Sequence, residues 1–270
     1  MESATKAAKM SLPDLNSGRR KALRKLAIRV CESCWRRHEH RIPVDLEQIA
    51  KDADLPVDFR FHKDRLGWIE SRNGKLRIFI DPELPSVSPS LYRFTLAHEL
   101  GHFFIRTHWS SLMAGQGIYY EGLPGKLPTL VPEQEANYFA ASLLLPDPEF
   151  LPHVAGTSLR LNLLRDIKET FAVSLECAAI RYVQAAIGLC AVIVIPPKGH
   201  PWMEVSEGLK RIGVRRDSKL APCSRSPESG PTALGNWFKV PLSKQTLPFS
   251  QEVQRYEDGG AIVLLREGFI

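Results

Sequence analysis

The sequence has no long apolar segment, so we do not expect a membrane protein. No apolar run approaches the ~20 residues that a transmembrane helix needs. The first ten residues also lack the apolar core of a secretory signal peptide. We therefore expect a cytoplasmic protein with no membrane partner. With 270 residues, of which 44% are hydrophobic, the chain is long enough for one or two packed domains.

Cysteine is also scarce. The five cysteines are an odd number and are widely spread, which favours a reducing compartment over a disulfide framework. Cys31 and Cys34 form a C-x-x-C pair, with His38 and His40 close behind. This pair could belong to a second zinc or redox site, but the chain has no second C-x-x-C or H-x-x-H pair to complete four ligands. We favour the alternative, in which both cysteines lie on the apolar face of a helix over residues 17–38.

Basic residues outnumber acidic ones, which gives a formal net charge of +6. A basic surface can attract nucleic acid or an acidic partner. The basic clusters lack the interleaved aromatic residues that stack on bases, so we favour solvated faces over a nucleic-acid site. The clusters are Arg19, Arg20, Lys21, Arg24, Lys25 and Arg29, and then Lys210, Arg211, Arg215 and Arg216.

One short motif carries the clearest chemical information. His98, Glu99 and His102 form the pattern H-E-x-x-H. On a helix, residues i and i+4 lie about one turn apart on the same face, so two imidazoles can bind one metal ion. Glu99 can then reach a water molecule at the metal and act as its general base. On a helix, this pattern is typical of zinc metalloproteases.

The residues around the motif indicate a buried helix. Leu96, Leu100 and Phe103 make its flanks apolar, which would keep water from the site except through a cleft. Gly101 lowers helix stability by about 1 kcal/mol relative to alanine, so we expect another backbone or the substrate to approach closely there. The alternative is a core helix with two buried, hydrogen-bonded histidines that bind no metal.

A catalytic zinc site needs three protein ligands and one open position. The predicted third ligand is Glu133, on a helix that begins near Pro132 and ends before Pro146. Asn137 lies one turn further along the same face and can hydrogen-bond a ligand imidazole. Glu135 points about 200° around the helix and is the alternative ligand. Without a metal, these glutamates would form a solvated acidic first turn.

Two segments of the chain resemble one known family. Residues 93–102 (RFTLAHELGH) and 133–146 (EQEANYFAASLLLP) are similar to the motifs of the ImmA/IrrE metallopeptidases of bacteria. The second motif is the more specific, because it is longer. The similarity extends more loosely over residues 20–185.

This resemblance implies both a cofactor and a substrate class. It implies Zn²⁺, or another divalent ion, held by His98, His102 and Glu133, with Glu99 as the catalytic carboxylate. Family members cleave helix-turn-helix transcriptional repressors and so switch on stress-response or mobile-element genes. A repressor of that type is therefore the expected protein substrate.

Helical and β-rich segments alternate along the chain, so we expect an α+β fold. A zincin-like metallopeptidase domain would contain helices and a small antiparallel sheet. Helix-turn-helix-like helices and a small β-rich domain would follow, and the resemblance to IrrE implies that this last domain is GAF-like. The expected segments are a flexible basic lead (1–17), the metallopeptidase domain (18–157), the helical segment (158–186) and the β-rich domain (187–270).

Strands are expected before the motif helix, at 57–62, 66–71 and 76–80, with a hairpin turn at 72–75. Ser88 or Ser90 would cap the motif helix. Residues 106–131 are rich in glycine and proline, which favours a long loop. The loop would bring His108, Tyr119 or Tyr120 near the site, where one of them could stabilise an oxyanion, although ordinary packing is the simpler role for each.

Residues 158–186 have the pattern of two helices joined by a tight turn, as in DNA-binding helix-turn-helix units. Direct DNA binding is one interpretation of this pattern. The second helix offers only Arg181 and Gln184 as long polar side chains, so we favour a structural role.

Taken together, the motifs predict a zinc-dependent endopeptidase, a hydrolase that cleaves a helix-turn-helix repressor. One alternative is a metal-containing regulator that binds a repressor or DNA without cutting. Another is a metallopeptidase with an unrelated protein substrate. The intact Glu99 favours cleavage, because a regulator that does not cut needs no general base.

Overall fold

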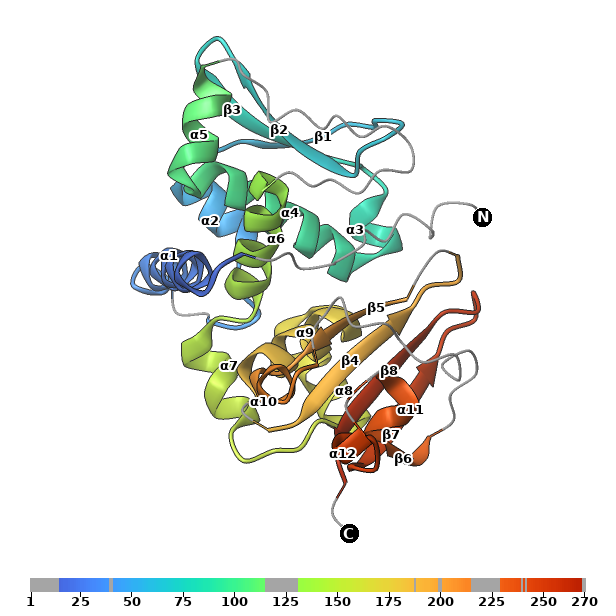
Figure 1. Ribbon diagram of the computed structural model, residues 1–270. Coiled ribbons are helices and arrows are strands. Elements are labelled where there is room, and N and C mark those ends of the chain that lie inside the picture. The colour runs from blue at the N-terminus through green and yellow to red at the C-terminus, as the bar shows by residue number, and fades with distance from the viewer. Residues whose placement is uncertain are drawn as a thin grey trace. The chain divides into compact units, whose positions relative to one another are not determined.

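The computed structural model describes residues 15–38, 41–114, 131–186, 188–198, 201–214, 229–238, 240 and 242–268 (Figure 1). Most of the predicted lead thus lies outside the described residues. The chain forms two compact units, of which the first holds Met1–Pro152 and Glu169–Ser174 and the second His153–Lys168 and Leu175–Ile270. Within the described ranges, no helix is both long and apolar enough to cross a bilayer.

The first unit begins with two capped helices. Helix α1 (Ser17–Trp35) starts where the Asn16 side chain accepts a hydrogen bond from the Arg19 backbone N–H. Its buried face holds Leu23, Ala27, Cys31 and Cys34, so both cysteines lie on the apolar face of a helix, as predicted. Helix α2 (Leu46–Asp52) starts in the same way at Asp45.

A three-stranded sheet follows, with strand order β1-β3-β2. Strands β2 (Gly67–Arg72) and β3 (Lys75–Ile80) form the predicted hairpin, and its turn residues Asn73 and Gly74 both have positive φ. Strand β1 (Val57–Phe59) is shorter than predicted and pairs with β3 in parallel. The small sheet expected to be antiparallel is so in its β2–β3 pair and parallel in its β1–β3 pair, because the turn fixes only the β2–β3 pair.

The short helix α3 (Leu84–Val87) leads into α4 (Pro89–Phe104), which carries the H-E-x-x-H motif. Ser88 occupies the cap position of α4 but makes no side-chain cap hydrogen bond. Helix α5 (Arg106–Met113) forms where a loop was expected. Of that loop, residues 115–130, with Tyr119 and Tyr120, lie outside the described ranges.

Helix α6 (Val131–Leu144) packs against both α1 and α4. It ends before Pro146, as the sequence predicts, and α7 (Asp147–Val154) follows. The face of α6 toward these helices is rich in small residues, since Ala136, Ala140 and Ala141 are all buried. This face allows the two site helices to approach each other closely.

In the second unit, the predicted helix pair is α8 (Leu161–Phe171), of which residues up to Lys168 belong to this unit, and α9 (Leu175–Ala185). Helix α9 packs against the strands β4 (Cys190–Ile195) and β5 (Trp202–Val205). Its residues 177–183 are all buried, including Arg181. A helix covered in this way does not present a face to a DNA groove, which agrees with the structural role favoured from the sequence.

The rest of the second unit is an antiparallel sheet with strand order β5-β4-β8-β7-β6 among the described residues. Strands β6 (Gly230–Ala233), β7 (Pro248–Arg255) and β8 (Ala261–Glu267) complete it. Alternate residues such as Ile193, Val263 and Leu265 join one core cluster with Leu209 and Trp237. The last two come from α10 (Glu207–Arg211) and α11 (Leu234–Trp237), and α12 (Leu242–Gln245) lies against α11.

These elements make the molecule the α+β protein that the sequence predicts, with a β-rich C-terminal part. The GAF-like description of that part and the predicted domain limits stay predictions.

Candidate metal centre

Helix α4 brings the two motif histidines together. Leu96 and Leu100, both with 0% of their surface exposed, hold the helix in the core. His98 and His102 lie one turn apart on one face, and their Nε2 atoms are 3.0 Å apart. Both imidazoles thus point the same nitrogen toward one place.

Helix α6 adds a carboxylate to this pair. Glu133 places Oε2 3.1 Å from His98 Nε2 and Oε1 3.4 Å from His102 Nε2. Zinc–ligand distances of about 2.0–2.2 Å put the ligand atoms of a tetrahedral ion about 3.3 Å apart. The spacing and the His₂Glu donor set therefore fit a zinc ion, with one position left for water or substrate.

The third predicted contact is also present. Asn137 Oδ1 lies 2.9 Å from His98 Nδ1, so the amide oxygen accepts the Nδ1–H of the imidazole. This hydrogen bond leaves the lone pair of His98 on Nε2, the atom that faces Glu133.

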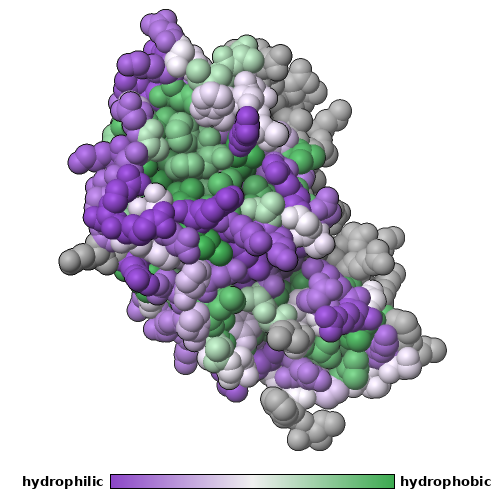
Figure 2. All heavy atoms as spheres, turned by 90° about the vertical axis from the view of Figure 1, so that its left-hand side faces the viewer, coloured by the Kyte–Doolittle hydropathy of each residue, from purple (hydrophilic) through white to green (hydrophobic). Residues whose placement is uncertain are grey.

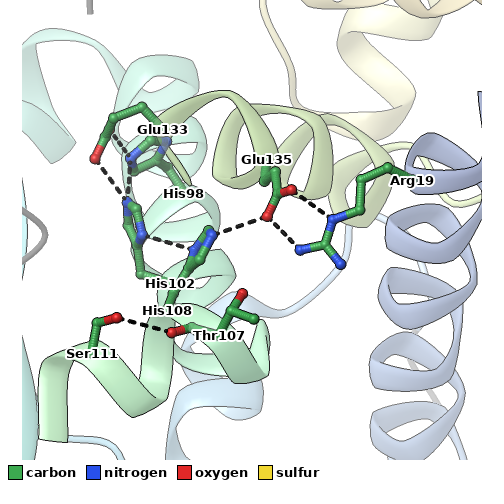
Figure 3. A network of polar contacts seen from close by, with 8 residues as sticks. All are labelled: Arg19, His98, His102, Thr107, His108, Ser111, Glu133 and Glu135. Carbon is green, nitrogen blue, oxygen red and sulfur yellow. Dashed lines mark hydrogen bonds and ion pairs between the residues drawn. The ribbon is translucent and has the colours of Figure 1, made fainter. Parts of the chain in front are cut away.

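His102 has a longer set of partners that the sequence analysis did not find (Figure 3). Its Nδ1 lies 3.2 Å from Nδ1 of His108, on α5, and His108 Nε2 lies 3.1 Å from Glu135 Oε2. Arg19, in the first turn of α1, binds both oxygens of Glu135, with Nε 2.6 Å from Oε1. A continuous line of contacts thus runs from α1 through α6 and α5 to the motif helix.

These contacts change two of the expectations. Glu135, the alternative ligand, has its oxygens on His108 and Arg19, and the metal-sized cluster contains Glu133 instead. His108 is buried, with both ring nitrogens engaged, so it has no N–H left for an oxyanion. Helical spacing correctly predicts that Glu135 points away from Glu133. The loop expected at 106–131 gives no prediction of where His108 lies, because His108 is on the helix α5.

Comparison with known protein families identifies this part of the chain. Residues 54–182 match the model of the peptidase M78 family, the IrrE N-terminal-like domain. This segment is similar to an IrrE N-terminal-like domain. The resemblance seen in the sequence is thereby confirmed, and the domain includes both site helices, α4 and α6. No curated protein sequence matches the chain.

A solved structure shows the same fold. It is described as a Mycobacterium tuberculosis transcriptional regulator and matches with a TM-score of 0.59 at 13% sequence identity. The match covers 93% of this chain and 78% of that one. At this identity the likeness concerns the fold alone.

The charges around the cluster within the matched segment favour a cation there. Burial opposes ionisation of Glu133, but hydrogen bonds from His102 and His98 outweigh it and lower the pKa of Glu133. Burial also opposes the charged form of His98, yet Glu133 outweighs it and raises the pKa of His98 to about 9. Glu133 thus stays an anion, the form in which a carboxyl group binds a metal ion, and its charge stabilises a positive charge at His98.

Glu99 lies in the same buried environment, with 5% of its surface exposed. Burial raises the pKa of its carboxyl group, while the charges of His98 and His102 oppose that rise. A carboxyl group with a raised pKa both accepts and returns a proton more readily at neutral pH.

Helices α4 and α6 come into close contact at Gly101. A Cβ atom on Gly101 would lie 3.1 Å from Phe139 Cδ1 and 3.2 Å from the Ala136 Cα of α6. The close approach expected from the sequence is therefore that of another backbone. It lets Glu133 reach the histidines of α4.

We predict that Gly101→Ala weakens metal binding even though alanine favours the helix by about 1 kcal/mol. The added methyl group meets backbone atoms of α6, so the helices must separate by a few tenths of an ångström, and the ligands with them. Zinc titration of the variant should show an affinity about tenfold or more below wild type. The control is Gly188→Ala, because a Cβ atom on Gly188 would have no neighbour within 4 Å. This variant should bind zinc as wild type does.

A second cluster lies at the end of α1. The ligand atoms of Cys34, His38 and Asp52 lie within 4.8 Å of one another. Asp52 already accepts a hydrogen bond from Gln48 at 2.8 Å and pairs with Arg37 at 3.4 Å and His38 at 3.3 Å. Because Arg37 supplies the positive charge there, we assign no metal to this cluster.

A hollow of about 220 Å³ lies beside that cluster, between α1 and α2. Figure 2 faces this side of the molecule and shows apolar side chains gathered among hydrophilic ones. The lining residues are Arg29, Val30, Ser33, Cys34, Arg37, Ile49, Asp52, Ala53 and Phe104. The described residues do not show what covers the hollow, so we assign it no ligand.

Proposed function

We propose that this chain is a zinc-dependent endopeptidase. The observation that carries the proposal is the convergence of His98 Nε2, His102 Nε2 and the Glu133 carboxylate, at 3.0–3.4 Å from one another. The peptidase family of residues 54–182 supports the same conclusion. The three residues hold the ion as ligands, and Asn137 orients His98 among them.

The proposed chemistry divides between the ion and Glu99. A bound Zn²⁺ polarises the scissile carbonyl group and makes water more acidic. Glu99 takes the proton from the attacking water and later gives it to the leaving amine. Its buried position and raised pKa suit both steps.

We propose that the substrate is a helix-turn-helix transcriptional repressor, cut at an exposed linker to derepress stress-response or mobile-element genes. The family resemblance supports this class, and the similar solved structure is described as a transcriptional regulator. Such a substrate acts on DNA, so the proposed location is the cytoplasm. The free thiols of the described cysteines are compatible with a reducing compartment.

We also propose that residues 187–270 form a GAF-like sensing domain that controls cleavage. A five-stranded antiparallel sheet with helices against its core cluster is compatible with that role. The predicted limits 1–17, 18–157 and 158–186 complete the proposed organisation.

The second candidate is a regulator that holds metal and binds a repressor or DNA without cutting it. The description of the similar structure as a regulator favours it. Glu99 opposes it, because burying a carboxyl group is unfavourable and a regulator that does not cut needs no general base there. The burial of α9 also opposes DNA reading by that helix.

The decisive experiment mixes zinc-loaded protein with candidate helix-turn-helix repressors and measures intact fragment masses. We expect one major cut in a linker, abolished by a chelator and restored by zinc. Zinc-loaded protein that binds a repressor tightly and leaves it intact would favour the regulator instead. Cleavage of unrelated proteins alone would retain the peptidase and remove the repressor as its substrate.

A further inference from the structure

We propose that Arg19, Glu135 and His108 form a positioning relay for the metal ligand His102. The inference rests on the proposed function, because it assumes that His102 binds zinc. None of the contacts that join Arg19, Glu135 and His108 to one another and to His102 involves the ligand Glu133. They act through the far nitrogen of His102 (Figure 3).

The contacts allow only one direction of hydrogen bonding that leaves His102 able to bind a metal. Two ring nitrogens 3.2 Å apart share one proton, so one of His102 Nδ1 and His108 Nδ1 must accept. The Glu135 carboxylate can only accept, so His108 Nε2 carries a proton and donates it. A neutral His108 then accepts at Nδ1, and His102 donates from Nδ1 and keeps its lone pair on Nε2.

Arg19 fixes the position of the Glu135 carboxylate, which accepts the hydrogen bond from His108. Its guanidinium binds both carboxylate oxygens of Glu135, a geometry that sets the plane of the carboxylate as well as its place. The Glu135 and His108 side chains are only 8% and 3% exposed, so their contact is shielded from water, while Arg19 itself is 35% exposed. Without Arg19, the buried carboxylate would lose the partner that compensates for its burial.

The two metal-binding imidazoles are thus held differently. Asn137 orients His98 with a single amide oxygen. His102 depends on three residues from three helices, α1, α5 and α6. Arg19 also lies outside the matched family segment 54–182, so α1 completes the site from beyond that domain.

The first test replaces His108 in the full-length protein. Leucine at this position removes both contacts, whereas glutamine offers an oxygen to accept and an N–H to donate. We expect His108→Leu to weaken zinc binding 10–100-fold, measured by competition with a chromogenic chelator. His108→Gln should stay within about fivefold of wild type. Equal affinities for the leucine variant and wild type would overturn the relay.

The second test separates positioning from simple packing of α1 on α6. Arg24 is a matched control, since it also joins α1 to α6, through Tyr138 Oη at 2.8 Å, and pairs with Asp147 of α7 at 3.7 Å. Arg19→Met should weaken zinc binding about tenfold or more, and Arg24→Met should not. Equal losses in both variants would show that Arg19 only ties the helices together.

A spectroscopic measurement on the unaltered protein keeps the inference testable if a variant fails to fold. In the ¹⁵N-labelled, zinc-loaded protein, His102 should carry its proton on Nδ1 and His108 on Nε2, as imidazole ¹⁵N shifts report. A zinc-loaded protein with the opposite proton pattern would overturn the relay alone. A wild-type protein that binds no zinc would overturn the proposed function itself.

Discussion

Glu99→Gln should retain zinc and repressor binding and lose cleavage by about a thousandfold or more. Glutamine keeps the size and the helix but cannot take a proton from water, and general-base catalysis alone contributes about 10²–10⁴-fold. The loss of the carboxylate charge beside the cluster weakens the transition state further. Single-turnover cleavage with fragment masses, together with zinc content, separates the two effects.

The control for this experiment is Glu83→Gln, an exposed glutamate of the same unit. It changes the same charge and should cleave like wild type. Cleavage by Glu99→Gln within about tenfold of wild type would place the general base elsewhere, since the smallest expected contribution is about a hundredfold.

Glu133→Ala should abolish stoichiometric zinc binding and all metal-dependent cleavage. The variant leaves two imidazoles at the cluster, and two ligands do not complete the three that a catalytic zinc site has. Equilibrium dialysis against zinc, followed by metal analysis, measures the loss directly.

Glu135→Ala is the comparison that distinguishes the two glutamates. It leaves all three ligands in place and removes the acceptor of His108, so it should keep one zinc ion with a 10–100-fold lower affinity. The contacts of Glu135 with His108 and Arg19 are the reason that we expect a loss of affinity at all. Retention of zinc by Glu133→Ala together with its loss from Glu135→Ala would move the third ligand to Glu135.

The centre of the site follows from local sequence patterns. The i, i+4 spacing of the motif places His98 and His102 on one face of a helix, and an apolar flank makes that helix a buried one. Helical geometry likewise puts Glu133 and Asn137 on one face of α6. Both rules depend on neighbours within a single helix, and such neighbours are visible in the sequence.

The relay has no such local signal. Arg19 and Glu135 are 116 positions apart, and Arg19 looks like one member of a basic cluster. The glycine and proline residues after position 113 made the whole segment 106–131 look like a loop, which concealed α5 and the place of His108. These contacts depend on how α1, α5 and α6 pack, which periodicity within one segment does not determine.

The sheets show the same division. The Asn73-Gly74 turn predicts the β2–β3 hairpin, whose two strands are adjacent in sequence. The parallel pairing of β1 with β3 joins strands that no short turn connects, so no local sequence pattern predicts it. In the second unit, the apolar runs at β4 and β8 were visible, but the short helices α10 and α11 that complete the core were not.

The central claim is that His98, His102 and Glu133 hold one catalytic zinc ion. Its most direct test is the zinc content of wild type and His98→Ala after dialysis against trace zinc, measured by elemental mass spectrometry, with circular dichroism to show that both proteins are folded. The account predicts one zinc ion per chain in wild type and almost none in the variant. Equal stoichiometric zinc in both folded proteins would contradict it.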